Sequence, residues 1–205
     1  MQQSFTDKLE INGHLTIHKI ANGVEELIFD DKNVIVSGFG WGLAYMYSRN
    51  GSTSITDYQI DRFQLGVSGN SSVQVSATNS LSGALSSIAE YTGAGDSNLY
   101  SFSANQYKNG TVITTPTPIY GKIPFSKVTK IDDTSVRYTI FLDEDTANSI
   151  ARDGNDAPLN EIGLFLTNPR DATPEASVLG AYKYFSNIVK TSDFGLVFRW
   201  TITFG

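Results

Sequence analysis

The chain has 205 residues and a net charge of −6, with 18% charged residues and no cysteine. Its basic residues form no cluster, which argues against a nucleic-acid partner because phosphate contacts come mainly from Lys and Arg. The lack of cysteine excludes disulfides, thiolate zinc sites and thiol nucleophiles. The first residues show no signal-peptide pattern, and no apolar run approaches the roughly 20 residues of a membrane span. We therefore expect synthesis in a cytoplasm and no membrane partner.

A β-hairpin is predicted near the N-terminus. Polar and apolar residues alternate over residues 14–20, which is the period of a half-buried strand. Asn22 and Gly23 suit the positive φ angles of a tight type I′ turn, and residues 24–29 form the returning strand. The polar run at residues 30–33 (DDKN) is expected to end that strand.

A short helix is predicted over residues 38–48. Ser37 is placed to cap its N-terminus, and Trp41, Ala44 and Tyr45 share one helical face. Three glycines in this segment lower the helix propensity by about 1 kcal/mol each. Their Gly-x-Gly spacing lacks the strand and helix context of a dinucleotide site, so it indicates close packing instead.

The middle of the chain predicts further strands. Residues 62–67 form a short one, and residues 134–143 alternate clearly between polar and apolar side chains. Two more strands are expected at about 99–107 and 119–130. Residues 68–98 are rich in Ser, Asn and Gly and suit a short helix or a surface excursion.

Three strands are expected to close the fold, the last of them ending at residue 204. Along this last strand one face is apolar, so that face is predicted to enter a core while the other meets a neighbouring subunit. Glu161 is interpreted as an edge charge that discourages strand aggregation. The candidate core residues are Ile162, Leu164, Phe198, Trp200, Ile202 and Phe204. The candidate subunit or partner contacts are Lys190, Asp193, Arg199, Thr201 and Thr203, with Lys190 and Asp193 either fixing their own loop or forming an inter-subunit pair.

The array of short strands with polar loops predicts a mainly β fold. The two architectures that fit are an antiparallel β-sandwich and an open barrel, with one or two short helices. We expect a single β-rich domain over residues 1–205. Within it, residues 1–32 are a candidate hairpin arm, and residues 68–130 are a candidate variable insertion that makes contacts particular to this chain.

The residues with catalytic or metal-binding chemistry form no recognisable site. His14 and His18, the only histidines, fall on one face of a strand about 13 Å apart, too far to share one zinc ion. Residues 153–156 (DGND) resemble a calcium loop but lack the glutamate at EF-hand distance, so a plain turn is the simpler interpretation. No nucleophile elbow of the G-x-S-x-G type occurs. The sequence therefore predicts no enzymatic activity, no cofactor and no metal.

Aromatic residues in polar segments leave a carbohydrate-binding alternative open. Tyr91, Tyr100, Tyr107 and Tyr120 lie in or near such segments and suit a surface on which sugar rings stack. Exposed aromatics also mark protein contacts, and Tyr commonly joins a core to solvent. A host-surface glycan is thus an alternative partner.

Three segments carry a family resemblance. The first is KNVIV at 32–36 with the Gly- and Ala-rich residues 38–47, and the second is FQLG at 63–66. The third and strongest is NEIGLF at 160–165, followed by LGAY at 179–182, KT at 190–191 and LVFRWTITF at 196–204. In this order the segments resemble virion proteins of tailed bacteriophages, of the baseplate and tail-fibre-associated type.

The resemblance implies a non-enzymatic structural component of a phage virion, in the tail, baseplate or fibre-attachment region. Its expected partners are other virion structural proteins and further copies of itself. Its expected location is the virion, in the phage tail, after synthesis in the host cytoplasm. A capsid decoration or head-fibre protein differs from this reading only in location, and it stays open beside the carbohydrate-binding alternative.

Overall fold

The computed structural model describes residues 10–48, 58–66, 107–108, 111–112, 121–144, 151–152, 155–156, 158–168 and 177–205. The strands of the main sheet are β1 (Ile11–Ala21), β2 (Val24–Ile35), β3 (Ile60–Gly66), β6 (Gly121–Lys122), β7 (Val128–Lys130), β8 (Ser135–Leu142), β11 (Leu159–Leu166), β12 (Val178–Ile188) and β13 (Gly195–Phe204). Two small ladders join β4 (Tyr107–Lys108) to β5 (Thr111–Val112) and β9 (Ala151–Arg152) to β10 (Asn155–Asp156). The helical segments are α1 (Ser37–Tyr47) and the 3-10 turn η1 (Phe125–Lys127).

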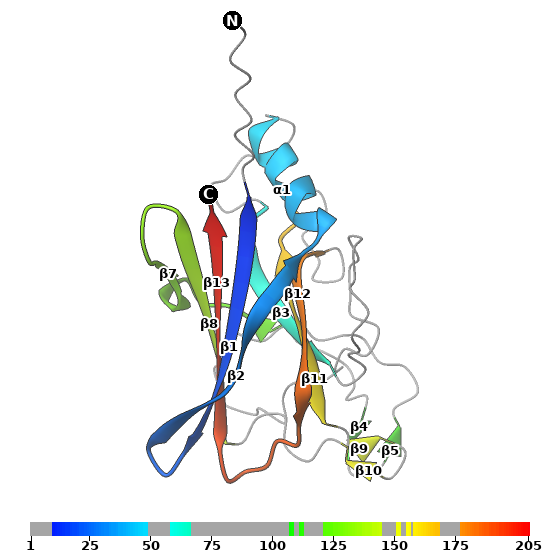
Figure 1. Ribbon diagram of the computed structural model, residues 1–205. Helices are drawn as coiled ribbons and strands as arrows, with labels where there is room; N and C mark the ends of the chain where they lie inside the picture. Colours follow the sequence, from blue (N-terminus) through cyan, green and yellow to red (C-terminus); the bar gives the residue numbers. More distant parts are fainter. Residues whose placement is uncertain are drawn as a thin grey trace, which may run out of the picture.

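The main sheet is antiparallel throughout and curls into a half-barrel, with α1 at one end (Figure 1). Its strand order is β6-β3-β11-β12-β2-β1-β13-β8-β7. The mainly β, antiparallel fold with a short helix that the sequence predicts is therefore confirmed. Within the described residues, no helix has the length and apolar character needed to cross a bilayer.

The N-terminal hairpin forms as predicted. β1 and β2 pair along their length around Asn22 and Gly23, whose φ angles of 51° and 76° are those a type I′ turn requires. The register shifts once, between Ile17 and His18, so that Ile28 has no counterpart on β1. This is a β-bulge, which bends the strand and increases its twist.

The predicted end of the second strand at residues 30–33 is wrong, because β2 continues to Ile35. Asp and Asn have low strand propensity, but cross-strand partners override it here. Asp30 pairs with His14, Asp31 pairs with Lys183, and Asn33 accepts a hydrogen bond from Trp200.

The long β2 strand belongs to two parts of the sheet. Residues 24–33 pair with β1, whereas Val34 and Ile35 pair with Tyr182 and Ala181 of β12. We call β7, β8, β13, β1 and β2 the first half-sheet, and β12, β11, β3 and β6 the second half-sheet. The two half-sheets are thus joined through one short stretch of β2.

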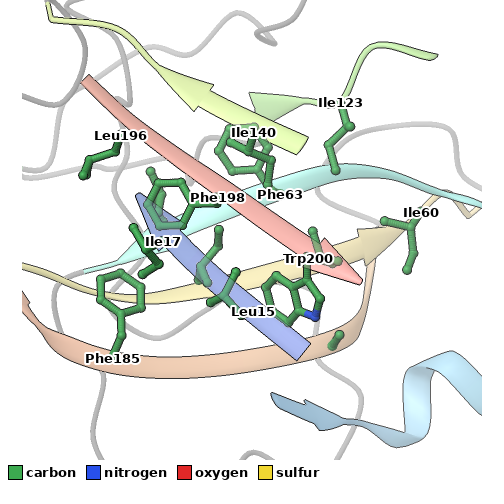
Figure 2. Close-up of a cluster of buried hydrophobic side chains, with 14 of the residues drawn as sticks. Leu15, Ile17, Ile60, Phe63, Ile123, Ile140, Phe185, Leu196, Phe198 and Trp200 are labelled. Atoms are coloured by element: carbon green, nitrogen blue, oxygen red, sulfur yellow. The ribbon is translucent and has the colours of Figure 1, made fainter. Parts of the chain in front are cut away.

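A hydrophobic core fills the space between the inner faces of the two half-sheets (Figure 2). Phe204 is half-buried at its margin, with its ring centroid 5.9 Å from that of Phe39 on α1. Each fully buried side chain contributes roughly 1.5–3 kcal/mol. Of the candidate core residues, Ile162, Leu164, Phe198, Trp200 and Ile202 have no exposed surface.

Within the second half-sheet, β11 is buried on both of its faces. All eight residues of β11 are buried, as expected for a short continuous apolar run. The interpretation of Glu161 as an edge charge is wrong, because β11 lies between β3 and β12 inside the sheet. Glu161 is 1% exposed, and its carboxylate accepts a hydrogen bond from the Tyr182 hydroxyl at 3.1 Å. Burying a carboxylate requires such donors.

The strand expected at 119–130 is interrupted. β6 and β7 occupy parts of it, and η1 lies between them. Pro124 precedes η1 and has no N–H to donate to a strand ladder, which explains the break. The strand expected at 99–107 meets the described part of the chain only at Tyr107 on β4, and residues 68–98 lie outside that part.

The α1 helix occupies the predicted segment, but two details differ. It begins at Ser37, and its N-cap residue is Val36, which provides no side-chain hydrogen bond; the predicted Ser37 cap is therefore wrong. The expected face of Trp41, Ala44 and Tyr45 is not the buried one. Ala44 is exposed, while the half-buried Tyr45 ring stacks on the buried Tyr58 ring and the half-buried Trp41 ring meets it edge-on.

The helix packs on the sheet through glycine instead. Its buried residues are Gly38, Phe39 and Gly42. A Cβ atom on Gly38 would lie 2.0 Å from the backbone oxygen of Leu179, and one on Gly42 would lie 2.3 Å from Leu166 Cδ2. Close approach of α1 to β12 therefore decides which face is buried, and the predicted packing role of the glycines is confirmed at these two positions.

Glycine substitutions in α1 test this packing. We expect Gly38→Ala to destabilise the protein by about 1–3 kcal/mol, because the added methyl group overpacks against rigid backbone. Gly40 faces open space, so Gly40→Ala should stabilise by up to about 1 kcal/mol through helix propensity alone. Urea unfolding of both variants measures the difference. Equal effects would show that α1 does not pack closely.

Trp200 tests the core in a similar way. The ring has no exposed surface, so we expect Trp200→Ala to cost about 3–5 kcal/mol in unfolding free energy. Phe125 is 92% exposed, and Phe125→Ser serves as a control that should stay within about 0.5 kcal/mol of the parent. A Trp200→Ala variant of near-normal stability would contradict the burial of this ring.

Candidate assembly surface

The contact residues predicted on β13 lie on the outer face of the first half-sheet. Arg199, Thr201 and Thr203 alternate with the buried residues of β13, so their side chains point away from the core. The registers of β2, β1, β13 and β8 place them in rows that run across the strands. Neighbouring strands lie about 4.8 Å apart, so residues in one row are in reach of each other.

Three of these rows are polar and lie next to one another. In order along the strands, they are Asp30, Thr16, Arg199 and Thr139; Lys32, His14, Thr201 and Arg137; and Asn12, Thr203 and Ser135. The rows combine charged and hydroxyl side chains of four strands that are far apart in the sequence. They form a continuous polar surface.

Hydrogen bonds and ion pairs connect the side chains of this surface. His14 Nε2 lies 2.6 Å from Asp30 Oδ1, and Glu25 is bound both by Arg199 and by His18, whose Nδ1 lies 2.8 Å away. On the other side of β13, Arg137 Nε donates to Thr201 Oγ1 at 3.3 Å, and the hydroxyls of Ser135 and Thr203 lie 3.1 Å apart. Several pairs of this kind hold the side chains in one arrangement before any partner binds.

Two carboxyl groups of β2 have altered acidity. The hydrogen bond from Arg199 lowers the pKa of Glu25 from its ordinary value, with smaller contributions from the charges of Arg199 and His18. The hydrogen bond from Lys183 lowers the pKa of Asp31 in the same way, assisted by the Lys32 backbone N–H. Both groups are therefore ionised at neutral pH, and each is attached to a cation on another strand.

A fourth row on the same face is apolar apart from His18. It contains Leu27, His18, Val197 and Phe141, which face one another across β2, β1, β13 and β8. Phe141 is 54% exposed and Leu27 is 51% exposed, while Val197 between them is buried. Protein interfaces commonly combine apolar and polar side chains, and this face presents an apolar row next to polar ones.

The two other candidate contacts lie in the loop before β13. Lys190 is 2% exposed, and its Nζ donates to the carbonyl oxygens of Glu144 and Thr191 at 3.3 and 2.9 Å. Asp193 is exposed and accepts a hydrogen bond from the Thr191 hydroxyl at 3.0 Å. Of the two roles the sequence left open, Lys190 therefore fixes the loop, and its position is apart from the polar rows.

The sequence did not indicate the partners of β13 on this face. Glu25, Asp30 and Arg137 belong to strands whose order in the sheet cannot be read from periodicity. Alternation alone places His14 and His18 on one face, as observed, but the acids that they contact follow from the hairpin register and its bulge. For Asp30, the available sequence signal was the number of residues that separate it from the Asn22-Gly23 turn, compared with the number that separates His14 from the same turn.

The remaining candidate residues form no site within the described residues. His14 and His18 contact different carboxylates, and the described part of the chain contains no group of three or more His, Cys, Asp or Glu arranged to hold a metal ion. Asn155 and Asp156 lie on β10, and residues 153–154 lie outside the described residues. Of the four tyrosines of the carbohydrate alternative, Tyr107 lies on β4, whereas Tyr91, Tyr100 and Tyr120 lie outside the described residues.

No protein-family model matches the sequence, and no curated protein or solved structure is significantly similar to this chain.

The lowered pKa of Glu25 allows a test of its contact with Arg199 of the polar rows. The pKa of Glu25 is lower in the folded state than its unfolded value of about 4.5. The ionised Glu25 side chain therefore stabilises the fold above that unfolded pKa. This stabilisation is lost as the pH falls through the lower pKa of the folded state. We expect Arg199→Met to raise the pKa of Glu25 and to reduce the loss of stability on acidification. NMR titration of the carboxyl group measures the pKa. Lys183→Met is the control, since it removes the partner of Asp31 and should leave Glu25 unchanged.

Proposed function

We propose that this chain is a structural protein of a tailed-bacteriophage virion, in the tail, baseplate or fibre-attachment region, and that it acts by assembly with other proteins. The resemblance of residues 160–204 to the closing strands of such proteins supports the virion role. In this chain the same residues form β11, β12 and β13, which are all interior strands of the half-barrel.

The observation that carries an assembly role is the outer face of the first half-sheet. An apolar row with the exposed Leu27 and Phe141 lies beside rows of mutually bonded polar side chains. Burying the exposed half of each of these two side chains against a partner would contribute roughly 1 kcal/mol each. The pre-arranged polar rows would add specificity, since charges at an interface select the partner and its register.

The direct test is the composition of the particle. Mass spectrometry of purified virions of the phage that encodes this chain should detect it in a fixed ratio to the known tail proteins. Its absence from intact particles would overturn the virion role. Light scattering of the purified chain at several concentrations then separates self-assembly, which gives a discrete multimer, from docking on another virion protein, which gives a monomer.

A variant of the apolar row tests the surface itself. We expect Phe141→Ser to weaken incorporation into particles by at least about tenfold, corresponding to 1.4 kcal/mol, because an exposed ring loses its contact in the assembly. Its unfolding free energy should fall by only about 1 kcal/mol, because the Phe141 ring is already half exposed. Phe125→Ser removes an exposed ring outside the rows and should be incorporated normally. Normal incorporation of Phe141→Ser would exclude this face as the contact.

A further inference from the structure

The β2 strand has a long side that pairs with no described strand. On one side, residues 24–33 pair with β1; on the other side, β2 pairs with β12 only through Val34 and Ile35. Beyond that point the two strands separate, and Figure 1 shows β2 following β1 while β12 stays with β11. Among the described elements, the free edge of β2, residues 24–33, therefore presents unpaired backbone N–H and C=O groups.

The point at which β2 and β12 separate is closed by Lys183. Its Nζ donates to Asp31 Oδ2 at 2.6 Å and to the carbonyl oxygen of Lys32 at 2.5 Å, and it lies 5.6 Å from the centre of the Phe29 ring. Lys183 thus binds one carbonyl group near the upper end of the free edge. Within the described part of the chain, the stretch from Val24 to Asp30 has no strand partner on this side.

A cavity of about 340 Å³ lies between the separated strands. Its lining residues are Lys19, Ile28, Phe29, Ser186, Asn187, Ile188, Val189 and Phe194. Ile28 is the bulge residue without a counterpart on β1, and it is 39% exposed; Val189 on the opposite side is 46% exposed. The cavity therefore lies directly against the free edge, and its apolar lining residues, Ile28, Phe29, Ile188, Val189 and Phe194, offer contacts to an apolar side chain.

The chemistry of this edge specifies its occupant. A row of alternating backbone donors and acceptors spaced about 3.3 Å per residue is matched by another extended polypeptide. The edge stretch contains four carboxylates against the single cation Lys32. Arg199, His14 and Lys183 pair with Glu25, Asp30 and Asp31, whereas Glu26 lies opposite Lys19 of β1 in the register and forms no ion pair among the described residues. A cationic side chain is therefore the complement of this edge.

We propose that the free edge of β2 is a strand-addition site, which binds an extended segment of another protein that carries a basic residue beside an apolar one. The backbone of the segment pairs with residues 24–30, the apolar side chain enters the cavity at Ile28, and the basic side chain contacts Glu26. Pairing of two copies through this edge is less favourable, because it brings acidic strands together. The site lies at the edge of the sheet rather than on its outer face, and it does not depend on the virion role.

Amide hydrogen exchange of the intact protein tests this site. The probe is a peptide of alternating lysine and valine, matched in length to residues 24–33. Alternate amides of this stretch point away from β1 and should exchange quickly in the free protein. We expect the peptide at millimolar concentration to slow them by at least about tenfold. A glutamate–valine peptide and a lysine–valine peptide with N-methylated backbone should leave them unchanged.

Two variants locate the binding. Ile28→Pro places a residue without an N–H at the bulge, and Glu26→Gln removes a carboxylate that forms no ion pair among the described residues, without a large change of shape. Each variant should lower the affinity for the lysine–valine peptide by at least about fivefold, measured by fluorescence anisotropy. Phe125→Ser should bind the peptide as the parent does. Far-UV circular dichroism checks the fold of Ile28→Pro. Unchanged exchange of the β2 amides, protection of other strands only, equal binding by Glu26→Gln, or a dimer formed through β2 would each overturn the proposal.

Discussion

The hydrogen bond from Trp200 Nε1 to Asn33 Oδ1, at 2.7 Å, lies where the two half-sheets meet. Asn33 is the last residue of β2 that pairs with β1, and Val34 begins the pairing with β12. The indole is fully buried, and its N–H needs a partner there. Asn33 supplies this partner and also packs directly on Gly13, where no larger residue fits. One polar side chain thus sets the point at which β2 leaves one half-sheet for the other.

This arrangement has consequences for both proposed surfaces. Because β2 follows β1 away from β12, residues 24–33 keep one edge that pairs with no described strand, and a cavity opens beside the bulge at Ile28. The hairpin register places Leu27 level with Phe141 and Asp30 level with Arg199 across the same face. β2 therefore contributes both to the outer face and to the free edge, and the two surfaces offer different contacts. The outer face suits the broad surface of a partner protein, and the free edge of β2 suits a single extended segment.

Periodicity predicted most of the strands that pair in the half-barrel. Residues 134–143 and the closing strands alternate as half-buried strands do, and the Asn22-Gly23 turn was specific enough to define a hairpin. The errors have physical causes in long-range contacts. Asp30 and Asn33 remain in a strand because of partners in β1 and β13, and the glycines of α1 turn toward β12 because the helix approaches it closely. Glu161 was placed at an edge because strand order is not encoded in any one segment.

The sequence by itself determined the β class, the hairpin, the short helix and the two-faced character of the last strand, because these depend on local propensity and on the period of side chains along one element. Only the tertiary structure decided which strands are neighbours. It thereby decided that Arg199 meets Glu25, that Lys190 binds its own loop and that β2 keeps a free edge. These contacts join residues as many as 174 positions apart, and the shared core that brings them together is a property of the whole chain.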